Sequence, residues 1–191
     1  KERPVQDNNW VEFGQGLAEL HLNYDDSFGF QETNYIGSVI QKNTQQNTWG
    51  SFYGSCRILP LIAKVPALKS EFSRLSQQTL QDKIQDIFPC EKPSLLHGDL
   101  WSGNVMNTTK GMAIYDPAVY YGHREMDIAM TFLFGGFDKK YLNAYQEVYP
   151  LEQQWEERVE LCQLYPLLVH AVLFGGSYVN SSLVILRKYF S

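Results

Sequence analysis

The stretch His97-Gly98-Asp99-Leu100-Trp101-Ser102-Gly103-Asn104 leads directly into a predicted β-hairpin. Two short strands are expected within residues 104–115, on either side of Thr108-Thr109-Lys110-Gly111, which has the chemistry of a hairpin turn. Asp116 ends the second strand. Because a hairpin brings the start of one strand beside the end of the next, Asn104 and Asp116 are expected to be neighbours in space.

Asp99 lies in the loop just before this hairpin, five positions ahead of Asn104. Phosphoryl transfer needs a carboxylate that orients and deprotonates an acceptor hydroxyl, and hard oxygen ligands that hold Mg²⁺ on the phosphates. The pattern therefore predicts Asp99 as the catalytic base, with Asn104 and Asp116 as ligands of Mg²⁺ and, through it, of ATP. The spacing is that of the H-x-D-x-x-x-x-N catalytic loop of kinases.

Helical periodicity dominates the rest of the chain. A helix over 10–22 is expected, with Asn9 as its N-cap, followed by a long polar loop over 23–47 and, after Asp116, by a Tyr-rich loop. The further helices are expected over 49–62, 66–87, 125–134, 138–148, 152–174 and 179–189. The predicted fold class is therefore mainly α, with one small β-hairpin that carries the candidate site.

The composition bounds the partners of the protein. The 191 residues suit one globular domain, and the net charge of −5 comes without any run of Lys or Arg. This disfavours nucleic acid and membrane surfaces, because both select for basic patches. The three cysteines show no metal-ligand spacing, which favours a reduced, cytoplasmic protein. The sequence does not predict an oligomeric state.

The stretch from His97 to Asn104 closely resembles the fructosamine kinase (ketosamine-3-kinase) family, which has an aminoglycoside phosphotransferase-like, protein-kinase-like fold. So does Tyr115-Asp116-Pro117-Ala118-Val119-Tyr120-Tyr121-Gly122-His123-Arg124-Glu125. Shorter stretches at 30–37, 134–137, 165–170 and 174–178 fit the same family, so the resemblance covers nearly the whole chain.

The resemblance implies ATP-dependent phosphorylation of a sugar hydroxyl, O3, on ketosamines such as ribulosamine or fructosamine adducts, free or on a glycated protein lysine. That phosphate destabilises the adduct and leads to deglycation. It also implies that residues 1–191 form the C-terminal catalytic lobe. Members of the family begin with an ATP-binding lobe that carries a phosphate-covering loop and a Lys, and no strand-rich segment of that kind precedes Trp10. We therefore expect the N-terminal lobe to be absent from this chain, which by itself could be inactive.

Further residues are candidates for a functional or a structural role. Trp101 either lines the acceptor pocket or packs on the lobe, and Tyr121 is a candidate substrate contact in the loop after Asp116. His97 is expected to support the catalytic loop by hydrogen bonding. His21 and His170 lie on apolar helix faces and are expected to be core histidines.

Two alternative functions remain open. One is a kinase of the same fold that acts on another small alcohol, such as an aminoglycoside or amino-alcohol. The other is a non-catalytic lobe or binding module, which the complete set of Asp99, Asn104 and Asp116 disfavours. A metal-dependent hydrolase is set aside, because a two-metal site needs more His or Asp ligands than this motif supplies.

Overall fold

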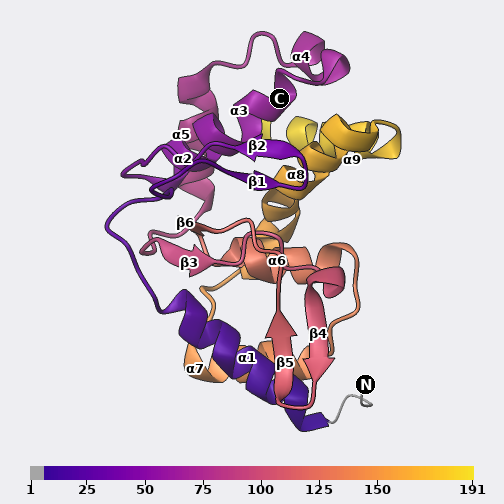
Figure 1. Cartoon of the computed structure of the whole chain (residues 1–191). Helices are drawn as coiled ribbons and strands as arrows, with labels where there is room; N and C mark the ends of the chain where they lie inside the picture. Colours follow the sequence, from indigo (N-terminus) through magenta and orange to yellow (C-terminus); the bar gives the residue numbers. More distant parts are fainter. Residues whose placement is uncertain (1–6) are drawn as a thin grey trace.

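The computed structural model describes residues 7–191 (Figure 1). The described part is mainly helical, with three separate two-stranded antiparallel sheets. The helices are α1 Asp7–His21, α2 Trp49–Phe52, the π-helical turn Tyr53–Ile58, α3 Leu59–Ile62, α4 Pro66–Glu71, α5 Gln77–Ile87, the 3₁₀ turn Ser102–Asn104, α6 Glu125–Leu133, α7 Lys139–Val148, α8 Trp155–Phe174 and α9 Ser177–Phe190. The strands are β1 Asn34–Ile36, β2 Val39–Gln41, β3 Ser94–Leu96, β4 Val105–Thr108, β5 Gly111–Ile114 and β6 Tyr120–Gly122. In this part of the chain, no helix is long and apolar enough to cross a membrane.

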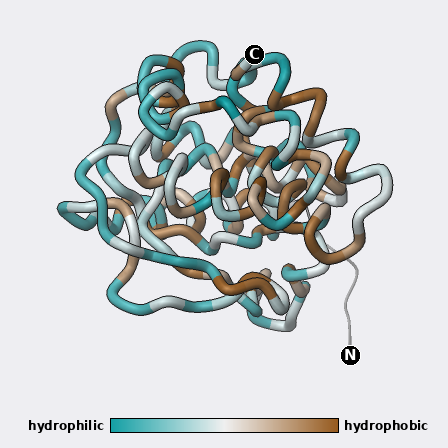
Figure 2. The backbone as a smooth tube through the Cα atoms, turned by 90° about the horizontal axis from the view of Figure 1, so that it is seen from above, coloured by the Kyte–Doolittle hydropathy of each residue, from teal (hydrophilic) through white to brown (hydrophobic). Residues whose placement is uncertain are grey.

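The apolar side chains form two cores that meet at α6. The larger core joins α2–α5 with α8 and α9, and it includes Met126 and Ala129 of α6. The smaller core joins α1 with α7, and it includes Ile128 of α6 and Leu100 of the candidate catalytic loop. Figure 2 shows the apolar segments gathered toward the middle of the molecule and the hydrophilic ones along its outer loops. Because Leu100 is fully buried, the loop around it is anchored in the smaller core.

The predicted hairpin is confirmed. Strands β4 and β5 pair from Val105 with Ile114 to Thr108 with Gly111, so Thr109 and Lys110 form a two-residue turn. Helix α1 runs beside this hairpin and packs against α7 (Figure 1). The two helices touch at Gly14, where a Cβ atom would lie 2.0 Å from the carbonyl oxygen of Tyr141.

Three local predictions are wrong at the N-terminal side. Asn9 does not cap α1, which begins at Asp7; its side-chain amide instead donates to Asn107 of β4 at 2.8 Å. The segment 23–47 is not a structureless loop, because β1 and β2 pair within it. The expected helix 66–87 is broken, since the hydroxyl of Ser76 caps a new helix by accepting from the amide of Thr79 at 3.0 Å.

The Tyr-rich segment after Asp116 is also more regular than predicted. It forms β6, which pairs antiparallel with β3 and places Tyr121 opposite Leu95. His123 and Arg124, which follow, are buried. This small sheet holds the two ends of the segment from His97 to Asp116, because β3 leads into His97 and β6 follows Asp116 (Figure 1).

Candidate active site

The loop that carries Asp99 is held by a buried carboxylate. Asp127 of α6 accepts hydrogen bonds from the backbone amides of His97 at 2.7 Å and Gly98 at 2.9 Å. Gly98 has a φ of +80°, and a Cβ atom there would lie 2.1 Å from the carbonyl oxygen of Ala118. Only glycine fits this position without strain, so the backbone just before Asp99 is tightly constrained.

Asp99 and Asn104 are in direct contact. The Nδ2 group of Asn104 donates to the backbone oxygen of Asp99 at 2.9 Å and to its Oδ2 at 3.2 Å. Burial raises the pKa of the Asp99 carboxyl above its usual range, and the nearby His97 ring and the Asn104 hydrogen bond offset this only in part. With Nδ2 used in this way, Oδ1 is the Asn104 atom suited to a cation.

Asp116 lies in a strained backbone conformation with a φ of +55°, and its side chain is exposed. Such a φ in a residue other than glycine is uncommon and is often found at functional sites. The amide of Tyr115, the preceding residue, donates to the carbonyl oxygen of Asn104 at 3.1 Å. The hairpin therefore brings the backbone of Asn104 to the residue beside Asp116, as predicted.

His97 connects the two parts of the motif. Its Nδ1 accepts from the amide of Asp99 at 3.3 Å, so its Nε2 donates to the carbonyl oxygen of Tyr115 at 3.0 Å. Its own carbonyl oxygen accepts from the amide of Ala118 at 2.9 Å. His97 thus fixes the chain on both sides of Asp116, in agreement with the supporting role predicted for it.

A cavity of about 360 Å³ opens beside Asp99. Its wall is largely aromatic and apolar, and it is formed by Ile36, Gly37, Asp99, Trp101, Met130, Phe134, Val169, His170, Leu173, Phe174 and Tyr178. Trp101 is 38% exposed and meets Phe134 edge-on at 6.0 Å between ring centroids. Of the two predicted substrate contacts, the structure brings Trp101 to this cavity. It places Tyr121 in β6, with its ring against Phe30 at 6.3 Å.

The C-terminal helices supply wall residues that sequence reasoning missed. His170 was expected in the core, yet it is half-buried and lines the cavity. Its Nδ1 lies 2.8 Å from the carbonyl oxygen of Pro166, which can only accept, so this nitrogen carries a hydrogen. Phe174 is 68% exposed. The available signal was that 134–137, 165–170 and 174–178 resemble family motifs, but this does not show which side chains face the cavity.

Few protein side chains at the site could coordinate a metal ion. Among residues 7–191, the His, Cys, Asp and Glu side chains do not form any group of three or more that could hold a metal ion. The donors available at the site are therefore the carboxylates of Asp99 and Asp116 and the amide oxygen of Asn104.

Known proteins resemble this chain along almost its whole length. The family model for fructosamine kinase matches residues 2–191. The chain is 40% identical to a probable ketoamine kinase of Enterococcus faecium, over 88% of this chain and 66% of that protein. It is 38% identical to the ketosamine-3-kinase of Mus musculus, over 92% of this chain and 58% of that protein.

A solved structure gives the same result. The crystal structure of a candidate fructosamine-3-kinase from Thermobifida fusca superposes with a TM-score of 0.83 and 37% identity, over 99% of this chain and 67% of that one. The chain thus spans 58% to 67% of the length of these relatives. Because one family model matches from residue 2 to residue 191, the chain belongs to the fructosamine kinase family.

Proposed function

We propose that this chain is the C-terminal catalytic lobe of an ATP-dependent phosphotransferase that phosphorylates the O3 hydroxyl of ketosamines such as ribulosamine or fructosamine adducts. The observation that carries the proposal is the position of Asp99. Its carboxylate contacts Asn104, and it also lines the aromatic cavity. An acceptor in the cavity and a nucleotide at Asn104 would therefore meet at one carboxylate.

Asp99 acts as the base in this proposal. As the acceptor oxygen attacks the γ-phosphorus, the proton of the hydroxyl passes to Asp99, and ADP leaves with the electrons of the broken P–O bond. The pKa of Asp99 is raised by burial, which makes it a better proton acceptor than an exposed aspartate. The contact with Asn104 fixes its orientation.

Asn104 and Asp116 would hold Mg²⁺ together with the phosphates of ATP. The donor set fits such a site, because Mg²⁺ is usually bound by one or two protein oxygens plus phosphate oxygens rather than by a complete protein cage. When bound, Mg²⁺ neutralises charge on the transferred phosphoryl group. Asp116 has a strained backbone and an exposed side chain. Its carboxylate is therefore accessible to a nucleotide that is also bound by residues outside this lobe.

The aromatic wall is the proposed acceptor site. A sugar ring can stack its C–H faces on Trp101, and a protonated ketoamine nitrogen can lie against aromatic faces. The ATP-binding lobe predicted from the resemblance lies outside residues 1–191 in this proposal. Similarity to a protein-ribulosamine 3-kinase of Arabidopsis thaliana, at 39% identity over 95% of this chain and 57% of that protein, supports a glycated-protein acceptor. The cytoplasmic location stays a prediction.

The acceptor can be tested by measuring ADP release from Mg-ATP with a panel of alcohols. The protein should carry this sequence together with an ATP-binding lobe. We expect fructose-lysine and ribulose-lysine to be used in preference to an aminoglycoside and to an amino-alcohol. Preference for either of the latter would identify a kinase of the same fold with another acceptor.

Asp99→Asn provides the matching variant. It should abolish release with every acceptor, whereas Asp138→Asn, at the exposed N-cap of α7, should not. If nucleotide binds but Asp99→Asn changes nothing, the chain acts as a binding module.

A further inference from the structure

His21, at the end of α1, is fully buried and has a partner at each ring nitrogen. Its Nε2 lies 3.2 Å from Oδ2 of Asp127, and its Nδ1 lies 2.8 Å from the hydroxyl of Tyr145 on α7. Asp127 is the carboxylate that holds the amides of His97 and Gly98. His21 is therefore separated from the loop that carries Asp99 by a single side chain.

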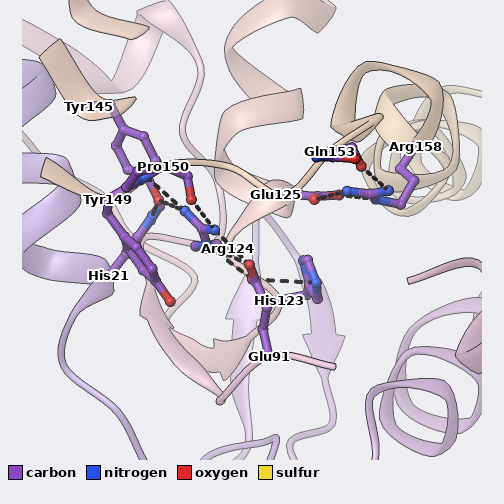
Figure 3. A network of polar contacts seen from close by, with 10 residues as sticks. All are labelled: His21, Glu91, His123, Arg124, Glu125, Tyr145, Tyr149, Pro150, Gln153 and Arg158. Atoms are coloured by element: carbon purple, nitrogen blue, oxygen red, sulfur yellow. Dashed lines mark hydrogen bonds and ion pairs between the residues drawn. The ribbon is translucent and has the colours of Figure 1, made fainter. Parts of the chain in front are cut away.

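Arg124 is the first donor in this series of hydrogen bonds. Its guanidinium donates to Glu91 at 2.6 Å and to the carbonyl oxygens of Tyr149 at 2.9 Å and Pro150 at 2.7 Å (Figure 3). Its NH1 group also lies 3.4 Å from the hydroxyl of Tyr145. A guanidinium can only donate, so the Tyr145 oxygen is the acceptor in this contact.

With its oxygen accepting from Arg124, the hydroxyl hydrogen of Tyr145 can point to His21. Burial raises the pKa of Tyr145, so the phenol keeps its proton and can donate a hydrogen bond to Nδ1. The ring of His21 carries a hydrogen on Nε2, because the Asp127 carboxylate beside it can only accept. Figure 3 shows Arg124 and Tyr145 together with His21 in this network.

Asp127 ends this series as a pure acceptor. Its Oδ2 accepts from His21 and from the amide of His97, and its Oδ1 accepts from the amide of Gly98. Burial on its own raises the pKa of Asp127, but hydrogen bonds from His21 and from the amide of Gly98 lower it, so the net pKa is lowered and the group stays ionised. Its orientation depends on donors from three directions.

We propose that His21 and Tyr145 are positioning residues that fix the catalytic loop through Asp127. Their hydrogen bonds set the rotation of the Asp127 carboxylate, and that carboxylate sets the path of the backbone at His97 and Gly98. The effect on Asp99 rests on the proposed function, whereas the effect on the loop does not.

Tyr145→Phe tests the proposal, with Tyr141→Phe as the matched control. Both tyrosines are buried on α7 and one helical turn apart, but the Tyr141 hydroxyl bonds Thr131 at 2.5 Å. Nitrogen-15 NMR should find the His21 ring in the Nε2–H form in the parent and in Tyr141→Phe. In Tyr145→Phe the hydrogen stays on Nε2, held by Asp127, and the Nδ1 signal should shift because its hydrogen bond is lost. A parent ring with its hydrogen on Nδ1 would overturn the proposal.

Amide hydrogen exchange measures the consequence for the loop. In Tyr145→Phe, exchange at His97 and Gly98 should rise about tenfold relative to the parent, because the hydrogen bond that orients His21, the side-chain donor to Asp127, is lost. Exchange at Leu168, buried in α8, reports general destabilisation and should change less. An equal rise at all three amides, or the same rise in Tyr141→Phe, would contradict a positioning role.

Steady-state kinetics provides a third measurement, which depends on the proposed function. In a form that transfers phosphate, Tyr145→Phe should lower kcat about tenfold and leave KM for the acceptor within about twofold, since the loop carries the base and not the wall. A rise in KM with unchanged kcat would contradict this. If no form is active, the proposed function fails while the NMR and exchange results still decide the proposal.

Discussion

The catalytic loop and the cavity wall are built in opposite ways. The loop residues His97 and Asn104 are buried, and every polar group that orients the loop has a named partner. The wall residues Trp101, Phe134 and Phe174 are exposed and held by ring contacts. Buried hydrogen-bonded groups keep one geometry, whereas exposed rings can adapt to a ligand. In the proposed function, this difference would separate a rigid region for chemistry from a permissive region for acceptor binding.

The largest effect is expected from removing the carboxylate beneath the loop. Asp127→Ala leaves the amides of His97 and Gly98 and the ring of His21 without their acceptor, which should cost about 3 kcal/mol of stability. Urea denaturation measures this cost. Asp138→Ala, which removes only the N-cap of α7, should cost about 1 kcal/mol. Equal losses would show that the loop is not specially held.

Two glycines with similar backbone conformations allow the steric cost of an added Cβ atom to be separated from the cost of a positive φ. Gly98 and Gly135 have φ values of +80° and +70°, but a Cβ atom at Gly135 would meet nothing within 4 Å. Gly98→Ala should therefore destabilise the protein by roughly 2–3 kcal/mol, and Gly135→Ala by about 1 kcal/mol. Thermal denaturation of both variants checks the difference. A smaller loss at Gly98 would mean that the loop can shift away from Ala118.

The titration of Asp99 tests whether burial in the rigid region raises the pKa of its carboxyl. Since burial raises the pKa of Asp99, the carboxyl should titrate above its ordinary value of 3.8. The base would then lose its function as pH falls through that raised pKa, and not at a lower pH. Asn104→Ala removes a hydrogen bond that lowers the pKa, so it should raise the pKa further. Carbon-13 NMR of the carboxyl follows both, and a midpoint at or below 3.8 would contradict the burial argument.

The smallest effect on stability is expected at the cavity wall. Phe174→Ala should change the free energy of unfolding by no more than about 0.5 kcal/mol, because the ring is 68% exposed. It should raise KM for the acceptor about fivefold through the lost aromatic contact. Val184→Ala, on α9 with 65% exposure and outside the cavity, should change neither. A fall in kcat at Phe174 would show that the wall also orients the reacting groups.

The same contrast explains what the sequence could predict. The hairpin, the spacing of Asp99 and Asn104 and most helix positions follow from local patterns, and the structure confirms these elements within a few residues. The supporting role of His97 also follows from its position as the first residue of the motif. These features depend on neighbours along the chain, which a sequence displays directly.

Features that depend on distant contacts were missed. Strands β1 and β2 were hidden because each is only three residues long and the alternation is mixed: Ile36 and Val39 are buried, but the buried Gln41 is polar and donates to the carbonyl oxygen of Ala118 at 2.9 Å. The pairing of β3 with β6 joins segments on either side of the catalytic loop. His170 shares an apolar helix with core residues, and only the packing of α8 against the loop shows that it faces the cavity.

The central claim is that Asp99 serves an acceptor bound in the aromatic cavity. Phosphorus-31 NMR of Mg-ATP with ribulose-lysine and fructose-lysine tests it most directly, on a protein that carries this chain with an ATP-binding lobe. The account predicts a new sugar-phosphate signal, assigned to O3 by its coupling to the sugar protons, that is absent in Asp99→Asn. A signal that persists in Asp99→Asn, or none from a protein that binds nucleotide, would contradict it.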